Sequence, residues 1–216
     1  MIEFKDVSFR YQGSEQANSL RHIDLQIPDG QVVLLCGRSG CGKTSLTRLI
    51  NGIIPHYFAG ELSGEVLLHG KNIAEQPIYE TARSVGSVFQ NPRSQFFNVD
   101  STGEAVFACE NMGWPAEKIG ERLAQVTREW SLAPLLGRNL FHLSGGEKQK
   151  IACASVTMYD PEVMVLDEPT SNLDIRSIRM LADIIRAWKR SGKTVLVAEH
   201  RLHYLASIAD RVIYME

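Results

Sequence analysis

Apolar and polar residues alternate at the start of the chain, as in a strand with one buried face. The apolar positions are Ile2, Phe4, Val7 and Phe9, and residues 22–27 repeat the alternation. Two neighbouring segments of this kind predict a pair of antiparallel strands. Each strand would bury one face, so together they indicate an N-terminal antiparallel β subdomain.

Three later segments are continuously apolar, which is typical of parallel strands covered on both faces. They span residues 32–36, 163–166 and 195–198. Between the second and the third, apolar residues recur at helical spacing over residues 178–188. Strand, helix and strand in this order predict a right-handed crossover and therefore a parallel sheet.

Two further stretches are predicted to be helical. One opens at Lys43 and places four apolar side chains on one face. These are Leu46, Leu49, Ile50 and Ile53. The other covers most of residues 101–158 and is broken near Pro115 and around residues 133–134. The whole pattern predicts a single α/β domain over residues 1–216, in which an inserted region at about residues 93–158 forms a helical subdomain.

Composition narrows the possible functions. The chain has 216 residues, of which 44% are hydrophobic and 22% are charged, and its formal net charge is -2. These values suit a folded, water-soluble protein, and they give no overall attraction to nucleic acid or to anionic lipid. No apolar run reaches the ~18 residues of a membrane-spanning helix. The four cysteines form no Cys-x-x-Cys pair, so we expect reduced thiols rather than a zinc site or disulfides.

A glycine-rich segment separates the first continuously apolar strand from the helix that follows it. It consists of Gly37, Arg38, Ser39, Gly40, Cys41, Gly42, Lys43 and Thr44, followed by Ser45. The segment, called here the phosphate-binding loop, fits the pattern G-x-x-x-x-G-K-[ST] in its required place between strand and helix. Glycines let backbone N–H groups surround phosphate oxygens, while Lys43 can reach the β- and γ-phosphates and the Thr44 hydroxyl can bind Mg²⁺.

An acidic pair ends the second apolar strand. Asp167 stands where a carboxylate would face the phosphates and help to hold the metal ion. Glu168 follows directly, and because neighbouring side chains at a strand end point in different directions, it can polarise the attacking water instead. The loop and the acidic pair together predict a protein that binds a nucleoside triphosphate with Mg²⁺ and hydrolyses it.

A third motif, called here the signature segment, reads Leu143, Ser144, Gly145, Gly146 and Glu147. With the two preceding motifs it resembles the ATPase subunits of ATP-binding cassette (ABC) transporters, whose signature is usually Leu-Ser-Gly-Gly-Gln. Physically, Ser144 and the N–H groups after it open a helix, which is a second anion-binding end. The resemblance implies that two cassettes pair head to tail, so that each signature segment faces the other cassette's phosphate-binding loop.

The resemblance also assigns roles to single residues. Tyr11 is similar to the aromatic residue that stacks on adenine, and Gln90 to the glutamine that contacts metal and water and responds to a transmembrane partner. His200 is similar to the histidine that contacts the γ-phosphate. Residues 171–174 resemble the loop that crosses the dimer interface, although Asn172 departs from the usual alanine. The implied catalytic residues are Glu168, His200 and Gln90, and the implied metal ligands are Thr44, Gln90 and Asp167.

Less specific stretches resemble one branch of the family, the energy-coupling-factor (cobalt-type) ATPases. Residues 91–97 are similar to its Asn-Pro-x-x-Gln-Leu-Phe run, residues 107–113 continue the similarity, and residues 51–66 resemble the first half of tandem-fused members. The branch imports vitamins or transition-metal ions through a separate membrane protein. It also leads us to expect another strand and more residues after Tyr214, as in a truncated chain or one half of a longer protein.

These expectations combine into an ATP-driven importer subunit at the cytoplasmic face of the cell membrane. ATP and Mg²⁺ would close a pair of cassettes, the second being another copy, a homologous chain or a fused domain, with no nucleic-acid partner. Hydrolysis would release the pair, and Gln90 with the region after it would pass the motion to transmembrane subunits. Phe96, Phe97 and Val99 would dock there, unless they are buried beneath the helical subdomain.

Other interpretations remain open. The chain could serve another class of ABC transporter, or act as an ABC ATPase on DNA or ribosomes, although it lacks the coiled-coil or basic extensions usual there. A P-loop kinase would leave residues 143–147 unexplained. A degenerate cassette that binds ATP without hydrolysing it would have no use for Glu168 and His200.

Overall fold

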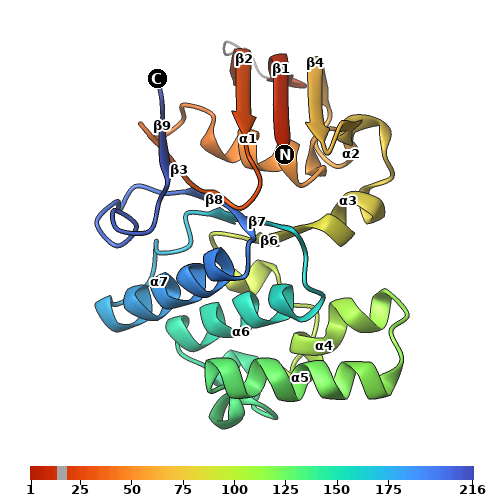
Figure 1. Ribbon diagram of the computed structural model, residues 1–216, viewed down its shortest axis with the longest axis vertical. Helices are drawn as coiled ribbons and strands as arrows, with labels where there is room; N and C mark the ends of the chain where they lie inside the picture. The colour runs from red at the N-terminus through yellow and green to blue at the C-terminus, as the bar shows by residue number, and fades with distance from the viewer. Residues whose placement is uncertain (14–18) are drawn as a thin grey trace.

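The computed structural model, which describes residues 1–13 and 19–216, contains two β-sheets of different kinds (Figure 1). The N-terminal sheet is antiparallel, with strand order β2-β1-β4-β5. Its strands are β1 (Ile2–Tyr11), β2 (Leu20–Ile27), β4 (Gly60–Leu68) and β5 (Lys71–Asn72). The predicted antiparallel pairing of the first two strands is confirmed, with Ile2 opposite Ile27.

The second sheet is parallel throughout, with strand order β6-β7-β8-β3-β9. Its strands are β3 (Val32–Gly37), β6 (Val85–Val88), β7 (Val163–Asp167), β8 (Thr194–Ala198) and β9 (Arg211–Met215). Three of them, β3, β7 and β8, are the continuously apolar segments of the sequence. Successive side chains of β3 enter opposite hydrophobic clusters, with Val33 and Leu35 in one and Val32 and Leu34 in the other. Both faces of the sheet are therefore covered.

Helix α1 (Lys43–Ile50) fills the space between the two sheets. Its Leu46 and Leu49 pack in one cluster with residues of both sheets. The sequence pattern placed Ile53 on this helix, which is wrong. Gly52 has a φ of 75°, the left-handed conformation that glycine favours, so α1 ends and the short helix α2 (Ile53–His56) begins in a new direction.

Helices α6 (Gly145–Met158) and α7 (Ile175–Arg190) cover the other face of the parallel sheet, and α4 (Ser101–Asn111) and α5 (Ala116–Trp130) pack with α6 in the helical subdomain (Figure 1). Helix α3 (Ile78–Ser84) precedes β6, and the 3-10 turn η1 (Ile73–Glu75) packs through Ile73 in the cluster between the two sheets. The other 3-10 turns are η2 (Pro92–Ser94), η3 (Ala133–Leu135) and η4 (Leu140–His142). The predicted α/β class with an antiparallel β subdomain and a helical subdomain is confirmed. None of the described helices is both long and apolar enough to span a membrane.

Helix α6 belongs to two cores at once. Its Ala152 and Val156 pack beneath the parallel sheet together with α7, whereas Ile151 and Met158 pack in the helical subdomain with α4 and α5. A helix that is buried on most of its circumference has no single apolar stripe. The helical subdomain is consequently anchored to the sheet through α6.

Three loops meet at one edge of the parallel sheet. Strands β3, β7 and β8 all end there, since Ala198 of β8 lies opposite both Leu35 and Asp167. Backbone hydrogen bonds continue beyond the strands, from Glu168 N to Ala198 O at 2.8 Å and from Glu199 N to Leu35 O at 3.0 Å. The phosphate-binding loop, the acidic pair and the segment after β8 are thereby brought side by side.

Asp210 stabilises the opposite end of the parallel sheet, where β3 begins. Its Oδ2 accepts a hydrogen bond from Val32 N at 2.9 Å, and its Oδ1 accepts one from Lys189 Nζ at 2.6 Å. These donors, Lys189 above all, hold the pKa of Asp210 below its usual value. A carboxyl group with a lowered folded-state pKa stabilises the fold above the unfolded-state pKa of about 3.9, and this stabilisation is lost as the pH falls through the folded-state value.

We predict that Asp210→Asn lowers the free energy of unfolding by about 1–2 kcal/mol at pH 7, because both hydrogen bonds lose a charged acceptor. Urea unfolding should also show a smaller loss of stability for the variant than for the wild type as the pH falls below 4. Asp183→Asn is the matched control, because it removes an exposed pair with Arg186 on α7 and should cost less than about 0.5 kcal/mol. Equal effects of the two substitutions would contradict the role of Asp210.

Candidate functional site

The phosphate-binding loop folds around the side chain of Lys43, which is 4% exposed. Its ammonium group donates hydrogen bonds to the carbonyl oxygens of Gly37 at 3.0 Å and Arg38 at 2.9 Å. Gly42 precedes α1 with a φ of 99°, and a Cβ at this position would lie 2.4 Å from the Ser19 carbonyl oxygen. Only glycine fits here, and the backbone N–H groups at the start of α1 remain free to meet an anion.

Thr44 and Asp167 meet as the sequence predicted. The Thr44 hydroxyl donates to Asp167 Oδ1 at 3.2 Å. Burial is the largest influence on Asp167 and raises the pKa of its carboxyl group, although the Thr44 hydrogen bond and the charges of Arg48 and Lys43 act in the opposite direction. A bound cation would favour the ionised form, and hydroxyl and carboxylate oxygens are the ligands that Mg²⁺ prefers. The residues present therefore fit this metal.

The side chain of Glu168 contacts both other predicted catalytic residues, Gln90 and His200. Its Oε2 accepts a hydrogen bond from Gln90 Nε2 at 3.0 Å, and its Oε1 lies 3.1 Å from His200 Nε2. The backbone of Glu168 is left-handed, with a φ of 44°. Non-glycine residues in this region are strained and cluster at active sites. The Glu168 carboxylate reaches the loop after β8 through its contact with His200.

The signature segment opens α6 with a reciprocal cap. Ser144 Oγ accepts from Glu147 N at 3.3 Å, and Glu147 Oε2 accepts from Ser144 N at 2.8 Å. The Ser144 N–H group is the largest cause that lowers the pKa of Glu147, and Arg138 at 3.2 Å adds to it. Glu147, which departs from the usual glutamine, is thus engaged in the cap. Ser144 and Gly145 are exposed.

The first turn of α6, which carries the signature segment, packs against the start of α7. A Cβ on Gly146 would lie 1.9 Å from Ser177 Oγ, so glycine is required for this close approach. Ser177 N in turn donates to Asp174 Oδ1 at 2.7 Å, which caps α7. A Cβ on Gly145 would lie 3.5 Å from the Asn172 carbonyl oxygen, so residues 171–174 also lie against the signature segment. Asn172, the departure in this loop, is exposed and donates to Ser171 Oγ at 3.4 Å.

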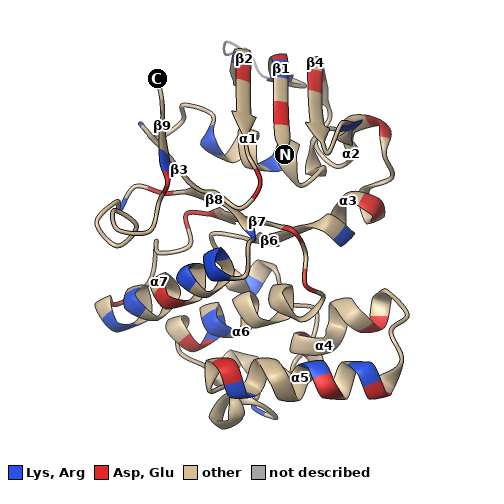
Figure 2. Cartoon of the chain, in the orientation of Figure 1, with Lys and Arg blue, Asp and Glu red and all other residues tan. Residues whose placement is uncertain are grey.

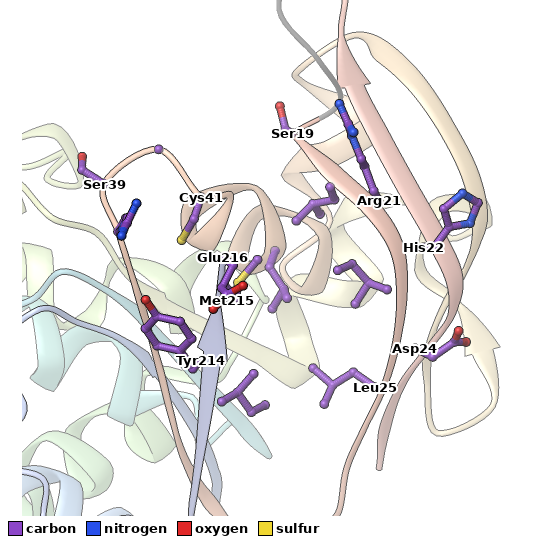
Figure 3. Close-up of a pocket in the computed structure, with 16 residues that line it drawn as sticks. Ser19, Arg21, His22, Asp24, Leu25, Ser39, Cys41, Tyr214, Met215 and Glu216 are labelled. Atoms are coloured by element: carbon purple, nitrogen blue, oxygen red, sulfur yellow. The ribbon is translucent and has the colours of Figure 1, made fainter.

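A cavity of about 740 Å³ lies beside the phosphate-binding loop. Ser39 and Cys41 face β2 across it, and the end of β9 lies between them (Figure 3). Its lining does not include the signature segment. Gly145 lines a different cavity, of about 420 Å³, together with Gln90. Thr44 at the start of α1 lines a third cavity, of about 280 Å³, which Gly145 does not line. Among the cavities of the described residues, the two anion-binding helix starts therefore share none.

Tyr11 is half-buried and does not line the cavity of Figure 3. Its hydroxyl lies 3.2 Å from Ser45 Oγ and accepts a hydrogen bond from Arg48 Nη1 at 3.0 Å. Its ring packs edge-on against Phe9, with 4.7 Å between centroids. The stacking of Tyr11 on adenine therefore stays a prediction.

The three residues predicted to form a docking surface have different environments. Phe96 packs against the cores of both the sheet and the helical subdomain. Phe97 is 78% exposed and Val99 is 59% exposed. The Phe97 ring stacks on Phe107 with 5.0 Å between centroids. Phe96 is thus partly buried, whereas Phe97 and Val99 are accessible, and their docking role stays a prediction.

Comparison with known proteins identifies the family. The profile of the ABC transporter family matches residues 20–171. A Treponema denticola protein described as an ABC transporter ATP-binding protein is 55% identical over 216 residues, which cover 100% of this chain and 44% of that protein. A Pyrococcus horikoshii protein of the same description is 40% identical over 220 residues, covering 100% of this chain and 76% of that protein. The chain belongs to the ABC transporter family.

A solved structure shows the same fold. The protein cbiO1 from Clostridium perfringens, described as part of the ABC transporter complex cbiONQ, is 27% identical with a TM-score of 0.85. The match covers 100% of this chain and 84% of that one. This chain shares its family with relatives that are described as ABC transporter ATP-binding proteins. It spans 44% of the length of two Treponema denticola relatives.

Sequence reasoning missed two charged residues of the cassette. The Arg48 guanidinium lies 4.2 Å from the centre of the Phe58 ring and donates to Tyr11. Its position one helical turn after Thr44 was a usable signal, because residues four apart share a helix face. Glu199 is buried at the end of β8, where an acidic residue directly after a continuously apolar strand was the only sign.

The cysteines differ in accessibility. Cys41 lines the cavity of Figure 3, whereas Cys36, Cys109 and Cys153 are buried. Burial raises the pKa of the Cys109 thiol to about 11 and that of Cys153 to about 12, which suppresses their reactive thiolate forms.

We predict that a disulfide-exchange reagent such as dithiobis(nitrobenzoate) modifies Cys41 first in the folded cassette. Millimolar ATP should slow this reaction several-fold, because the nucleotide's phosphates would cover the loop. Cys41→Ser is the control, and it should remove the fast phase alone. A fast phase that persists in this variant, or a rate of modification that ATP does not change, would contradict the placement of Cys41 in the nucleotide site.

Proposed function

We propose that this cassette binds and hydrolyses ATP to power an ABC importer of the energy-coupling-factor type, which takes up vitamins or transition-metal ions. The observation that supports hydrolysis most strongly is the carboxylate of Glu168, held between Gln90 and His200 beside the phosphate-binding loop. A carboxylate fixed in this way can orient and polarise a water molecule.

ATP binding uses groups that already converge. Lys43 turns its ammonium group from the loop carbonyls to the β- and γ-phosphates, and the N–H groups at the start of α1 meet the phosphate oxygens. Thr44, Asp167 and Gln90 would hold Mg²⁺, which neutralises charge on the phosphates. We propose that adenine enters beside Tyr11, the last residue of β1, whose ring packs against Phe9.

Hydrolysis requires Glu168 and His200 to separate and admit substrate. In the structure their side chains contact each other at 3.1 Å, so the water and the γ-phosphate must enter between them. Glu168 then accepts the hydrogen bond of the attacking water, and His200 contacts the γ-phosphate. Gln90 donates a hydrogen bond to the same Glu168 carboxylate. A movement of Glu168 during hydrolysis would therefore move Gln90 and the region that follows it.

A second cassette completes the site. The exposed N–H groups at the start of α6 form an anion-binding end that lies outside the cavity of the same copy's phosphate-binding loop. Head-to-tail pairing would place Ser144, Gly145, Gly146 and Glu147 of one cassette on the ATP of the other. ATP would thus hold the pair together, and its hydrolysis would release it.

Transmembrane subunits are the proposed partners, at the cytoplasmic face of the membrane. Phe97 and Phe107 line an apolar cavity of about 310 Å³ together with Ile78, which suits an apolar segment of such a partner. The assembly of cbiO1 within cbiONQ supports this arrangement. An ABC ATPase that acts on DNA would need a strongly basic surface, whereas Figure 2 shows charges of both signs along α5 and along α7, where the positive charges predominate.

We predict that Glu168→Gln retains ATP binding and slows phosphate release by about 10²–10³-fold, because the amide cannot accept a proton. Calorimetry with ATP and a phosphate-release assay measure the two properties. Glu162→Gln is the matched control, since it makes the same exchange just before the other end of β7 and should leave both unchanged. Wild-type turnover in the Glu168 variant would exclude its proposed role.

A mixing experiment tests the composite site. Lys43→Ala removes the phosphate contact of one partner and Ser144→Arg blocks the signature helix of the other, so each variant alone should be inactive. An equal mixture should recover roughly a quarter of the wild-type rate, because half of the random pairs are mixed and each mixed pair has one intact site. If no activity returns at any protein concentration, two copies of this cassette do not share their sites.

A further inference from the structure

Glu199 is a buried acidic residue that the proposed reaction does not use. It follows β8 directly and is 2% exposed. In the described part of the chain, no lysine, arginine or histidine nitrogen forms an ion pair with it. Burying a carboxylate without a cationic partner is costly unless hydrogen-bond donors satisfy both of its oxygens.

Four donors satisfy the two oxygens of Glu199. Oε1 accepts from the backbone N–H groups of His200 at 2.8 Å and Arg201 at 3.2 Å. Oε2 accepts from the Thr170 hydroxyl at 2.6 Å and the Tyr204 hydroxyl at 3.3 Å. A carboxylate is the side chain that can accept all four, because it carries acceptor sites and no hydrogen. The charge of Glu199, after burial itself, raises the pKa of Tyr204 and so keeps that hydroxyl a donor.

The hydrogen bond from Thr170 joins two catalytic loops. Thr170 is fully buried and stands two residues after Glu168, and Glu199 stands directly before His200. The two loops are thus bridged twice: at the surface by the contact between Glu168 and His200, and in the interior by Thr170 and Glu199. Arg201 adds a weaker link, from Nη1 to Leu173 O at 3.4 Å.

Substrate binding affects the two bridges differently. The surface bridge must open when water and the γ-phosphate enter between its side chains. The interior bridge has no access to substrate, because both of its residues are buried. It can therefore hold the loops in register while the surface bridge is open.

We infer that Glu199 is a positioning residue for ATP hydrolysis, which fixes the Glu168 loop relative to the His200 loop through its hydrogen bond with Thr170. The inference rests on the roles proposed for Glu168 and His200. It concerns turnover alone, because neither Glu199 nor Thr170 lines the cavity beside the phosphate-binding loop.

Substitutions of Thr170 separate the hydrogen bond from packing. Thr170→Val keeps the volume of the side chain and removes the hydroxyl, whereas Thr170→Ser keeps the hydroxyl and removes a methyl group. The matched control is Thr194→Val on β8, because Thr194 is also buried and its hydroxyl accepts a hydrogen bond from Gly30 N at 3.0 Å. Glu199→Gln serves as a further variant, which removes the charge at nearly constant volume.

We expect Thr170→Val and Glu199→Gln to lower kcat about tenfold, because a small displacement of catalytic groups is costly to turnover. Calorimetry with a non-hydrolysable ATP analogue should show unchanged affinity and an unchanged number of sites, which a partly unfolded variant would not retain. Thr170→Ser should restore kcat to within about twofold of the wild type, and Thr194→Val should match the wild type.

Two outcomes would overturn the inference. One is that Thr170→Val turns over like Thr194→Val, and the other is that Thr170→Ser is the slower of the two Thr170 variants, which would show a packing role. Glu168→Gln, assayed alongside, keeps the two proposals apart. If that variant hydrolyses ATP normally, the proposed catalytic site is wrong; if it is inactive while Thr170→Val is unimpaired, only the role of Glu199 is excluded.

Discussion

The chemistry of this cassette depends on three parallel strands that end at the same edge of one sheet. In β3, β7 and β8 the register places Ala198 beside both Leu35 and Asp167. Such a sheet is stable only when both of its faces are covered, and here α1 with the antiparallel sheet covers one face while α6 and α7 cover the other. The burial that forms the core also brings the phosphate-binding loop, the acidic pair and His200 together.

Convergence at this edge has an electrostatic cost. Asp167 loses solvation, and its raised pKa expresses this loss. Lys43 is buried too, but its ammonium group is satisfied by two loop carbonyls at 2.9–3.0 Å. Glu168 is in a left-handed backbone conformation. A bound cation would complement the Asp167 carboxylate, so its unfavourable burial and the affinity of the site for a metal ion have the same origin.

Much of this arrangement was predictable from sequence. Continuous apolar runs identified β3, β7 and β8, and spacing identified Lys43, Thr44, Asp167 and Glu168, because a parallel sheet and phosphate chemistry impose strict local patterns. Strand β6, which reads Val-Gly-Ser-Val, was missed since its own propensity is weak and pairing with β7 determines it.

Tertiary context decides the remaining features. Phe96 is partly buried against the core and Phe97 is 78% exposed, although the two residues are adjacent and chemically identical. Thr170 and Glu199 are 29 residues apart, and no local sequence pattern predicts their contact. The same holds for Gly146, whose missing side chain admits Ser177.

The contact at Gly146 links the two proposed halves of the ATP cycle. Helix α6 carries the signature segment and packs in both the sheet core and the helical subdomain. At its first turn it touches α7, whose cap Asp174 ends the loop that begins at Glu168. A rotation of the helical subdomain that shifted α6 would therefore press on this loop directly. The groups that would hold a partner's ATP and those that would hydrolyse the copy's own ATP are connected through packed atoms within one copy, which gives a paired cassette a physical reason to couple its two sites.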